Sequence, residues 1–207
     1  QAVVDEARSR IAEFFGVDSR EILFTGSATE SNNLALRGVI RAYSAPSPKL
    51  WSVGDKLPLG LFEPERPQSR RPELGVEGQM ANDKFPHIIT STIEHESVLK
   101  TCQDLEAKGE AEVTYVEGNA EGFVSPEDIK KALRPETILV SVMFVNNEIG
   151  TIQPLSEIAK IVQDFRKRKS ENLNSKFETN ANPNHPYPLL PIPYPLLHSD
   201  AVQAIQY

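Results

Sequence analysis

The sequence predicts an α/β fold in three layers, with a mainly parallel sheet and helices on both of its faces. Short apolar stretches typical of strands alternate along the chain with longer amphipathic stretches typical of helices. Repeated alternation of this kind produces parallel strands joined by helices that cross over the sheet. In addition, Thr137–Val145 is apolar throughout, as expected of a strand that is buried on both faces.

Proline placement divides the chain into ordered parts and inserts. Of the 16 prolines, 7 lie between residues 46 and 86, and 6 lie between residues 183 and 195. Proline fixes φ and lacks an N–H donor, so neither stretch suits a regular helix or an inner strand. We therefore expect one domain over residues 1–207, interrupted by proline-rich inserts at about 44–84 and 170–195.

The part of the chain before the first insert predicts a helix, a strand and a second helix. Apolar side chains recur at helical spacing from Val3 to Phe15, and Gly16 ends that helix. Glu21–Thr25 is a short apolar stretch that predicts a strand. Glu30–Tyr43 then predicts the second helix.

The alternation continues between the two inserts. His87–Ser91 predicts a strand, and Glu96–Ala107 predicts a helix whose apolar face includes Cys102. Glu112–Val116 predicts the next strand. Ser125 is a suitable N-cap for a following helix, because its side-chain oxygen accepts hydrogen bonds from backbone N–H groups. The proline at the first helical position is a second sign that a helix begins here.

The last three elements complete the pattern. Thr137–Val145 predicts the buried strand, and Pro154–Lys167 predicts an amphipathic helix. Leu196–Ser199, directly after the second insert, predicts a final short strand.

Composition excludes several classes of function. The net charge of −7 argues against a nucleic-acid-binding surface, and no apolar run is long enough to cross a membrane. Cys102 is the single cysteine, which rules out an internal disulfide framework and a multi-cysteine metal centre, so we expect no metal. The first residues show neither the basic nor the apolar region of a secretory signal.

Ligands of parallel sheets bind at the carboxyl ends of the strands, so the residues that follow each strand are the candidates. After the first predicted strand, residues 25–33 read TGSATESNN. Small residues at a helix start, here Ala28 and Thr29, let backbone N–H groups approach an anion. An ordinary capped helix is the alternative, and the stretch matches neither the dinucleotide-binding nor the P-loop pattern.

Polar side chains follow the other predicted strands as well. His95 could serve as an acid–base group or stack on a planar ligand, or it could simply cap a helix. Asn147, in the string NNEIG, suggests a ligand contact, with an Asx turn as the alternative. Asp200, with Gln203 beyond it, suits the binding of a protonated ring nitrogen. Because one topology gathers all these positions, the sequence predicts a common site.

Four strings carry a resemblance to a known family: FTGSATESNNLALRGV, HIITSTIEHESVLKTCQDLE, TILVSVMFVNNEIGTIQPLSEIAKI and HSDAVQA. In this order they resemble the large domain of the cysteine desulfurases, which are pyridoxal-phosphate enzymes of the class V aminotransferase group. The strings ATESNN, EHESV and NNEIG are similar to those of the iron–sulfur-assembly type. The resemblance implies that the chain is an internal fragment of the PLP-binding large domain of the PLP-dependent transferase fold type I.

The resemblance also implies a role for each candidate residue. Ala28 and Thr29 would contact the phosphate of pyridoxal 5'-phosphate. His95 would stack on the pyridine ring as the catalytic imidazole, and Asp200 would keep the ring nitrogen protonated. Asn147 and Gln203 would form hydrogen bonds near the phenolic oxygen of the cofactor. The full set is Ala28, Thr29, His95, Asn147, Asp200 and Gln203.

The activity implied by the resemblance is conversion of L-cysteine to L-alanine, with the sulfur held as an enzyme-bound persulfide for iron–sulfur cluster or thio-cofactor assembly. The implied partners are a second copy of the full-length chain in a homodimer and a sulfur-acceptor scaffold protein. Neither nucleic acid nor a membrane is an expected partner. The family works in mitochondria or in the cytoplasm.

The chain departs from the family pattern at several places. Gly26-Ser27 stands where the family usually has Ser-Gly, and Phe144 stands where a histidine is common. Neither the segment with the Schiff-base lysine nor the loop with the persulfide cysteine is among these residues. We therefore expect the fragment alone to be inactive. Two alternatives remain open, a selenocysteine lyase-like enzyme and a non-catalytic truncated homologue.

Overall fold

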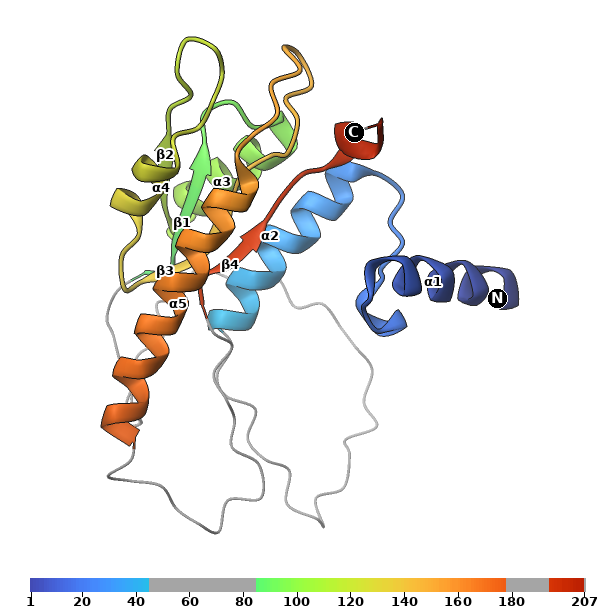
Figure 1. Ribbon diagram of the computed structural model, residues 1–207, viewed down its shortest axis with the longest axis horizontal. Helices are drawn as coiled ribbons and strands as arrows, with labels where there is room; N and C mark the ends of the chain where they lie inside the picture. The colour runs from blue at the N-terminus through green and yellow to red at the C-terminus, as the bar shows by residue number, and fades with distance from the viewer. Residues whose placement is uncertain (45–84, 178–193, 207) are drawn as a thin grey trace.

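A four-stranded parallel sheet forms the centre of the protein (Figure 1). The computed structural model describes residues 1–44, 85–177 and 194–206. The order of the strands is β2-β1-β3-β4, and every neighbouring pair is parallel, which confirms the predicted α/β class. The strands are β1 (His87–Ser91), β2 (Glu112–Val116), β3 (Thr137–Ser141) and β4 (Leu196–His198).

Two helices, α2 (Ala28–Ser44) and α3 (Glu96–Ala107), cover one face of the sheet. The fully buried side chains of Leu36 and Val98 pack there against Ile88 of β1 and against β3. Residues four apart on α2 share its buried face because they lie one helical turn apart. This layer confirms the second and third predicted helices, with α2 beginning two residues earlier than expected.

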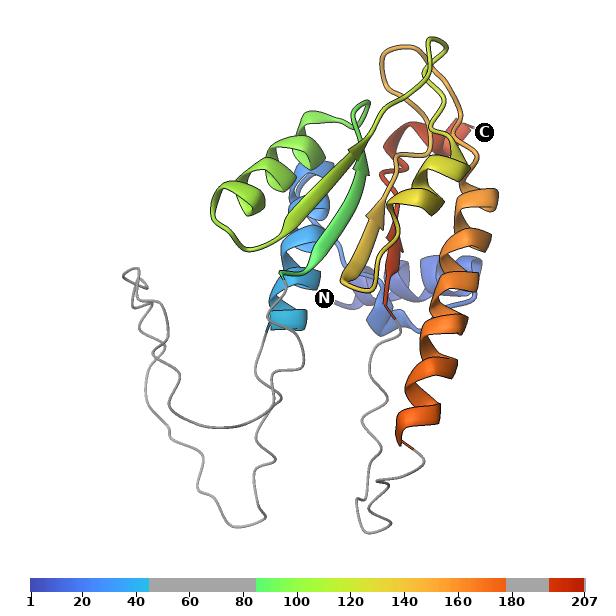
Figure 2. The same cartoon turned by 90° about the vertical axis from the view of Figure 1, so that its left-hand side faces the viewer.

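Two other helices, α4 (Pro126–Ala132) and α5 (Leu155–Phe177), cover the opposite face (Figure 2). Ile129 and Ile158 pack there against Ile89, the neighbour of Ile88 on β1. Adjacent strand residues point to opposite faces, so β1 contributes to both layers of the core. The predicted helix N-cap is confirmed as well, since the side chain of Ser125 accepts a hydrogen bond from the third residue that follows it.

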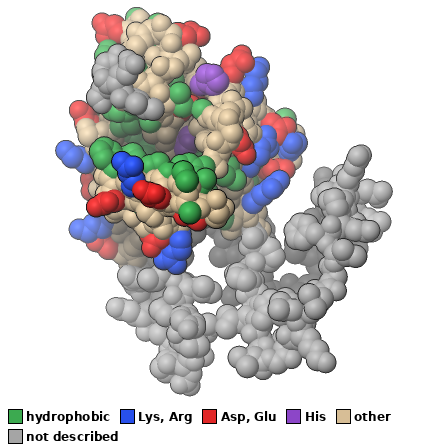
Figure 3. All heavy atoms as spheres, turned by 90° about the vertical axis from the view of Figure 1, so that its right-hand side faces the viewer, with side chains coloured by type: hydrophobic (Ala, Val, Ile, Leu, Met, Phe, Trp, Pro, Cys, Tyr) green, Lys and Arg blue, Asp and Glu red, His purple; other side chains and the backbone are tan. Residues whose placement is uncertain are grey.

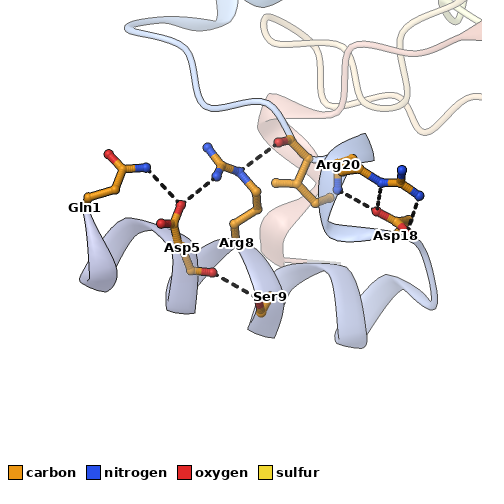
Figure 4. Close-up of polar contacts among 7 residues, drawn as sticks. Gln1, Asp5, Arg8, Ser9, Asp18 and Arg20 are labelled. Carbon is orange, nitrogen blue, oxygen red and sulfur yellow. Dashed lines mark hydrogen bonds and ion pairs between the residues drawn. The ribbon is translucent and has the colours of Figure 1, made fainter.

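The first helix, α1 (Ala2–Phe15), lies to one side of the sheet and packs against the short 3-10 helix η1 (Ser19–Glu21). Gly16 ends α1 with a φ of 66°, a left-handed conformation that glycine adopts without strain. Arg8 joins the two elements, because its Nε donates to the carbonyl of Ile22 at 3.2 Å (Figure 4). Phe14 is 84% exposed, and a band of hydrophobic side chains crosses this side of the molecule (Figure 3).

The predicted strand at Glu21–Thr25 is wrong. Glu21 belongs to η1 instead, where its side chain and that of Asp18 form a reciprocal capping box. A strand also needs a neighbouring ladder, and none of the four described strands pairs with residues 22–25. The residues that lead into α2 therefore follow an irregular path.

The ends of two elements also differ from the predictions. β3 ends at Ser141, although Val142–Val145 remains within the interior apart from the half-buried Phe144. α5 continues to Phe177, ten residues beyond the predicted end at Lys167, and so occupies the first part of the expected second insert. The rest of the two expected inserts lies mostly outside the described residues. No helix in the described parts is both long and apolar enough to span a bilayer.

Candidate functional site

Parallel strands bring their carboxyl ends to one edge of the sheet, where Asp200 and His95 enter a common chain of hydrogen bonds. The side-chain amide of Asn32, on α2, donates to Asp200 Oδ2 and to Ser97 Oγ, each at 2.8 Å. Ser97 Oγ in turn lies 2.8 Å from His95 Nδ1. Two candidates that are 105 positions apart are thus connected through two residues, one from α2 and one from α3.

His95 is the N-cap of α3, which is the simplest of the roles that its position allows. The backbone N–H of Ser97 donates to His95 Nδ1 at 3.1 Å, so this nitrogen presents a lone pair. In the neutral ring the proton then resides on Nε2. Because the side chain is exposed, Nε2–H and the ring face remain available to a ligand.

Asp200 follows β4 and is half-buried. Each of its carboxylate oxygens accepts a hydrogen bond: Oδ2 from Asn32, and Oδ1 from the backbone N–H of Val202 at 3.1 Å. Both donors are neutral, so they orient the carboxyl group without supplying a countercharge. The side chain is therefore fixed in orientation and can still attract a cation.

The predicted anion-binding turn leads into the first turn of α2. Ala28 and Thr29 are the first two residues of the helix, where backbone N–H groups have no partner within the helix. Gly26 differs, because its N–H donates to Glu30 Oε2 at 2.7 Å. The N–H of Glu30 is also used, because it donates to Ser27 Oγ at 3.2 Å as in an ordinary capped helix. This leaves the N–H groups of Ala28 and Thr29 as the donors for an anion.

Thr29 and His95 line the same surface pocket, which has a volume of about 340 Å³. Arg37 of α2 and Lys100 of α3 contribute positive charge to its wall, and Glu96 of α3 contributes one negative charge. Arg37 also forms an ion pair with Asp104 at 2.8 Å. Cations beside a helix N-terminus favour a bound anion. Two candidates from separate stretches of the sequence thus contribute to one cavity.

The structure does not bring Asn147 and Gln203 into this hydrogen-bond chain. Both side chains are exposed, at the turn after β3 and in the 3-10 helix η2 (Val202–Gln206). The preceding residue, Asn146, is buried and forms an Asx turn: its Oδ1 accepts from the N–H groups of Glu148 and Ile149. The cofactor contacts of Asn147 and Gln203 stay predictions.

Asn32 and Ser97 are the members of the site that the sequence reasoning missed. Asn32 lies on the same face of α2 as Leu36 and Ile40, at intervals of four residues, and only 4% of it is exposed. A polar side chain on an otherwise apolar helix face needs a buried partner. That irregularity in the helical pattern is the signal that could have identified Asn32.

Cys102 and His87 have structural roles. Cys102 is fully buried in the α3 layer, and burial raises the pKa of its thiol to about 12, as is typical of a structural cysteine. His87 stands at the opposite end of β1 from the site. Burial lowers its pKa to about 4, and its ring nitrogens contact the hydroxyls of Thr137 and Thr114.

A parallel sheet between two helix layers, with an acid and an imidazole at the strand exits, defines the class of the protein as an α/β protein of the type I transferase fold. Residues 1–49 and 77–168 match the model of the family "Aminotransferase class-V". The chain belongs to the class V aminotransferase family. Its relatives confirm the resemblance to the cysteine desulfurases.

Two of these relatives illustrate the range of sources. The chain is 39% identical over 165 residues to the cysteine desulfurase IscS of Dictyoglomus turgidum. The matched region covers 80% of this chain and 32% of that protein. The chain is also 39% identical over 164 residues to the mitosomal cysteine desulfurase of Encephalitozoon cuniculi, with 79% and 29% covered. The chain thus spans about a third of the length of the curated relatives it matches.

Solved structures agree with the sequence relatives. The fold is similar to that of a NifS-like protein, with a TM-score of 0.59, 28% identity and coverage of 96% of this chain and 37% of that one. DndA from Streptomyces lividans gives a TM-score of 0.58 and 30% identity, with 97% and 37% covered. Both comparisons extend over almost the whole of the present chain.

Proposed function

We propose that this chain forms the cofactor-binding part of a PLP-dependent cysteine desulfurase, which converts L-cysteine to L-alanine and retains the sulfur as a persulfide. The observation that carries the proposal is the chain of hydrogen bonds from Asp200 through Asn32 and Ser97 to His95. It holds an acid and an imidazole in fixed positions at the edge of the sheet where such folds bind their ligands. The named relatives support the choice of substrate.

The residues of this edge fit the chemistry of pyridoxal phosphate. The Asp200 carboxylate suits the protonated nitrogen of the pyridine ring, and the exposed ring of His95 suits stacking on its face. Thr29, at a helix N-terminus in a pocket with two cations, suits the phosphate. When bound, the cofactor supplies a ring that accepts electrons from the substrate Cα.

The chain's own contribution is to orient the cofactor and to polarise its ring. Asp200 keeps a proton at the ring nitrogen, and Asn32 prevents the carboxylate from turning away by donating to Oδ2. Ser97 holds Nδ1 of His95, so this imidazole can donate only from Nε2. The same amide of Asn32 fixes both groups, which couples the position of the acid to that of the imidazole.

The implied partners and compartment belong to the same proposal. We infer a homodimer of the full-length protein and a scaffold protein that accepts the sulfur, as the resemblance implies. The relatives include bacterial and mitosomal enzymes, which supports a cytoplasmic or mitochondrial setting. Asn147 and Gln203 are proposed to contact the cofactor near its phenolic oxygen when it is bound.

The proposal is tested by incubating the full-length protein with pyridoxal phosphate, L-cysteine and a thiol reductant. Alanine and sulfide are expected in equal amounts, because the reaction breaks one C–S bond for each alanine formed. Turnover of selenocysteine with no sulfide from cysteine would favour a selenocysteine lyase-like enzyme. Cofactor binding without either product would favour a non-catalytic homologue.

Replacing Thr29 with valine is expected to weaken cofactor binding more than it lowers the rate at saturating cofactor. The lost hydroxyl would donate to a charged phosphate, which is worth about 1.5–3 kcal/mol, or at least roughly a tenfold rise in Kd. Equilibrium dialysis of the 207-residue chain against pyridoxal phosphate measures this. The matched control is Thr29→Ser, which keeps the hydroxyl and should restore binding. Equal retention by Thr29→Val would instead support an ordinary capped helix.

A further inference from the structure

Glu94 is a buried acid that the proposed function does not use. It stands between β1 and His95, and only 5% of it is exposed. Its Oε1 accepts a hydrogen bond from the hydroxyl of Ser91 at 2.6 Å and another from the backbone N–H of Met143 at 2.8 Å. Ser91 ends β1, and Met143 follows β3. One carboxyl oxygen thus ties together the ends of two neighbouring strands.

The second oxygen, Oε2, is buried and has no hydrogen-bond partner among the residues that the structure describes. A charged oxygen in this situation loses its hydration without compensation. A proton on Oε2 removes the cost of the buried charge, which is larger than that of a buried hydroxyl without a partner, and leaves Oε1 free to accept from both donors. The geometry of Glu94 is therefore that of a neutral carboxylic acid.

The surroundings of Glu94 favour its neutral form on balance. Burial, and more weakly the negative charge of Asp200, raise its pKa, whereas the hydrogen bonds from Ser91 and Met143 lower it; together they bring the pKa of Glu94 to about 7. On the α3 side the neighbouring titratable group is Cys102, whose own pKa of about 12 keeps it neutral. Asp200 differs from Glu94 in having hydrogen bonds on both oxygens.

We propose that Glu94 is a positioning residue, which in its neutral form ties β1 to the segment after β3 and leaves Asp200 as the charged acid of the pair. The second part of this inference rests on the proposed function, since it gives Asp200 its purpose. Two acids in different environments then have different roles: Asp200 carries the negative charge, and Glu94 joins the ends of the two strands.

Ionisation of Glu94 would disturb the site through the next residue in the chain. A charged, unpartnered Oε2 would draw water or turn toward solvent, and so loosen the contact with Met143. His95 follows directly and depends on the same turn for its position as the N-cap of α3. Cofactor affinity should therefore fall as the pH rises through about 7, the pKa that Glu94 has in this environment.

The first experiment follows the carboxyl carbon of glutamates by ¹³C NMR in the cofactor-free chain, from about pH 5 to about pH 9. One resonance is expected to titrate near pH 7, to be absent in Glu94→Gln and to persist in Glu110→Gln, a variant of an exposed glutamate. Ser91→Ala should move this titration to higher pH, because it removes a donor that favours the ionised form. Titration of Glu94 together with the exposed glutamates would overturn the proposal.

The second experiment measures the Kd of pyridoxal phosphate by equilibrium dialysis at about pH 6 and about pH 8.5. The Kd at the higher pH divided by the Kd at the lower pH should be roughly fivefold larger for the parent and for Glu110→Gln than for Glu94→Gln. The glutamine side chain resembles the neutral acid at both pH values. Equal ratios in all three proteins would overturn the positioning role. Absence of binding by all three would contradict the proposed function, and the carbon resonance would still decide the state of Glu94.

Discussion

Asp200→Asn in the full-length protein is expected to lower turnover of L-cysteine by roughly 10- to 100-fold, because a charge-assisted hydrogen bond worth about 1.5–3 kcal/mol is lost where the reaction needs it. An amide does not hold a proton on a pyridine nitrogen as a carboxylate does. The new amide would also meet the amide of Asn32, which now donates to Oδ2 at 2.8 Å. Either Asn32 would rotate to offer its oxygen, or the new side chain would turn its NH2 group toward the N–H of Val202 and lose that hydrogen bond.

Rotation of Asn32 would have a second consequence for the same variant. The oxygen of Asn32 would face Ser97, so the serine hydroxyl would donate to Asn32 instead of lying against Nδ1 of His95. Steady-state kinetics of sulfide release measure the effect. Asp128→Asn is the control, since Asp128 is an acid of α4, on the other side of the sheet, and forms an ion pair with Lys131. Activity of Asp200→Asn within twofold of this control would remove Asp200 from the site.

Asn32→Ala is expected to destabilise the protein by about 2–4 kcal/mol, because two buried hydrogen bonds disappear, one of them to a charged group. Chemical unfolding at neutral pH measures the loss. The same variant should also increase the Kd of pyridoxal phosphate, since Asp200 and the Ser97–His95 pair lose the group that joins them.

The control for this variant is Gln153→Ala, which removes another buried amide. Gln153 donates to the carbonyl of Gly122, accepts from the N–H of Val124, and takes no part in the link between Asp200 and His95. Gln153→Ala should therefore change stability without changing how these two groups are joined. If both variants had the same effect on cofactor affinity, the link through Asn32 would have no functional meaning.

The sequence predicted the order of elements well where hydrophobic period and capping agree. Glu96–Ala107 was predicted with the bounds that the structure has, because its apolar face is regular. Glu21–Thr25 failed since strand formation depends on a partner that a local pattern does not contain. The end of α5 failed because its last turns carry few apolar residues, so the hydrophobic period gave no sign that the helix continues to Phe177.

The site was predictable only in part. The rule that ligands bind at the carboxyl ends of parallel strands pointed to His95 and Asp200, and both lie at that edge. The residues that join them come from helices, and no spacing in the sequence indicates that Asn32 reaches across to the end of β4. The sequence also does not show that Asn146 forms the Asx turn while the side chain of Asn147 is exposed, because the orientation of adjacent residues after a strand depends on the folded turn.

The hydrogen bond between Asn32 and Asp200 also constrains the time at which the site can exist. The two residues are 168 positions apart, so α2 leaves the ribosome long before β4 is synthesised. Contacts between distant parts of a chain form slowly, since a long loop must close before any bond compensates for its entropy. The part of the candidate site formed by α2 and α3 can therefore assemble early, whereas the part formed by Asp200 has to wait for β4. A nascent chain would meet its cofactor only after translation has passed Asp200.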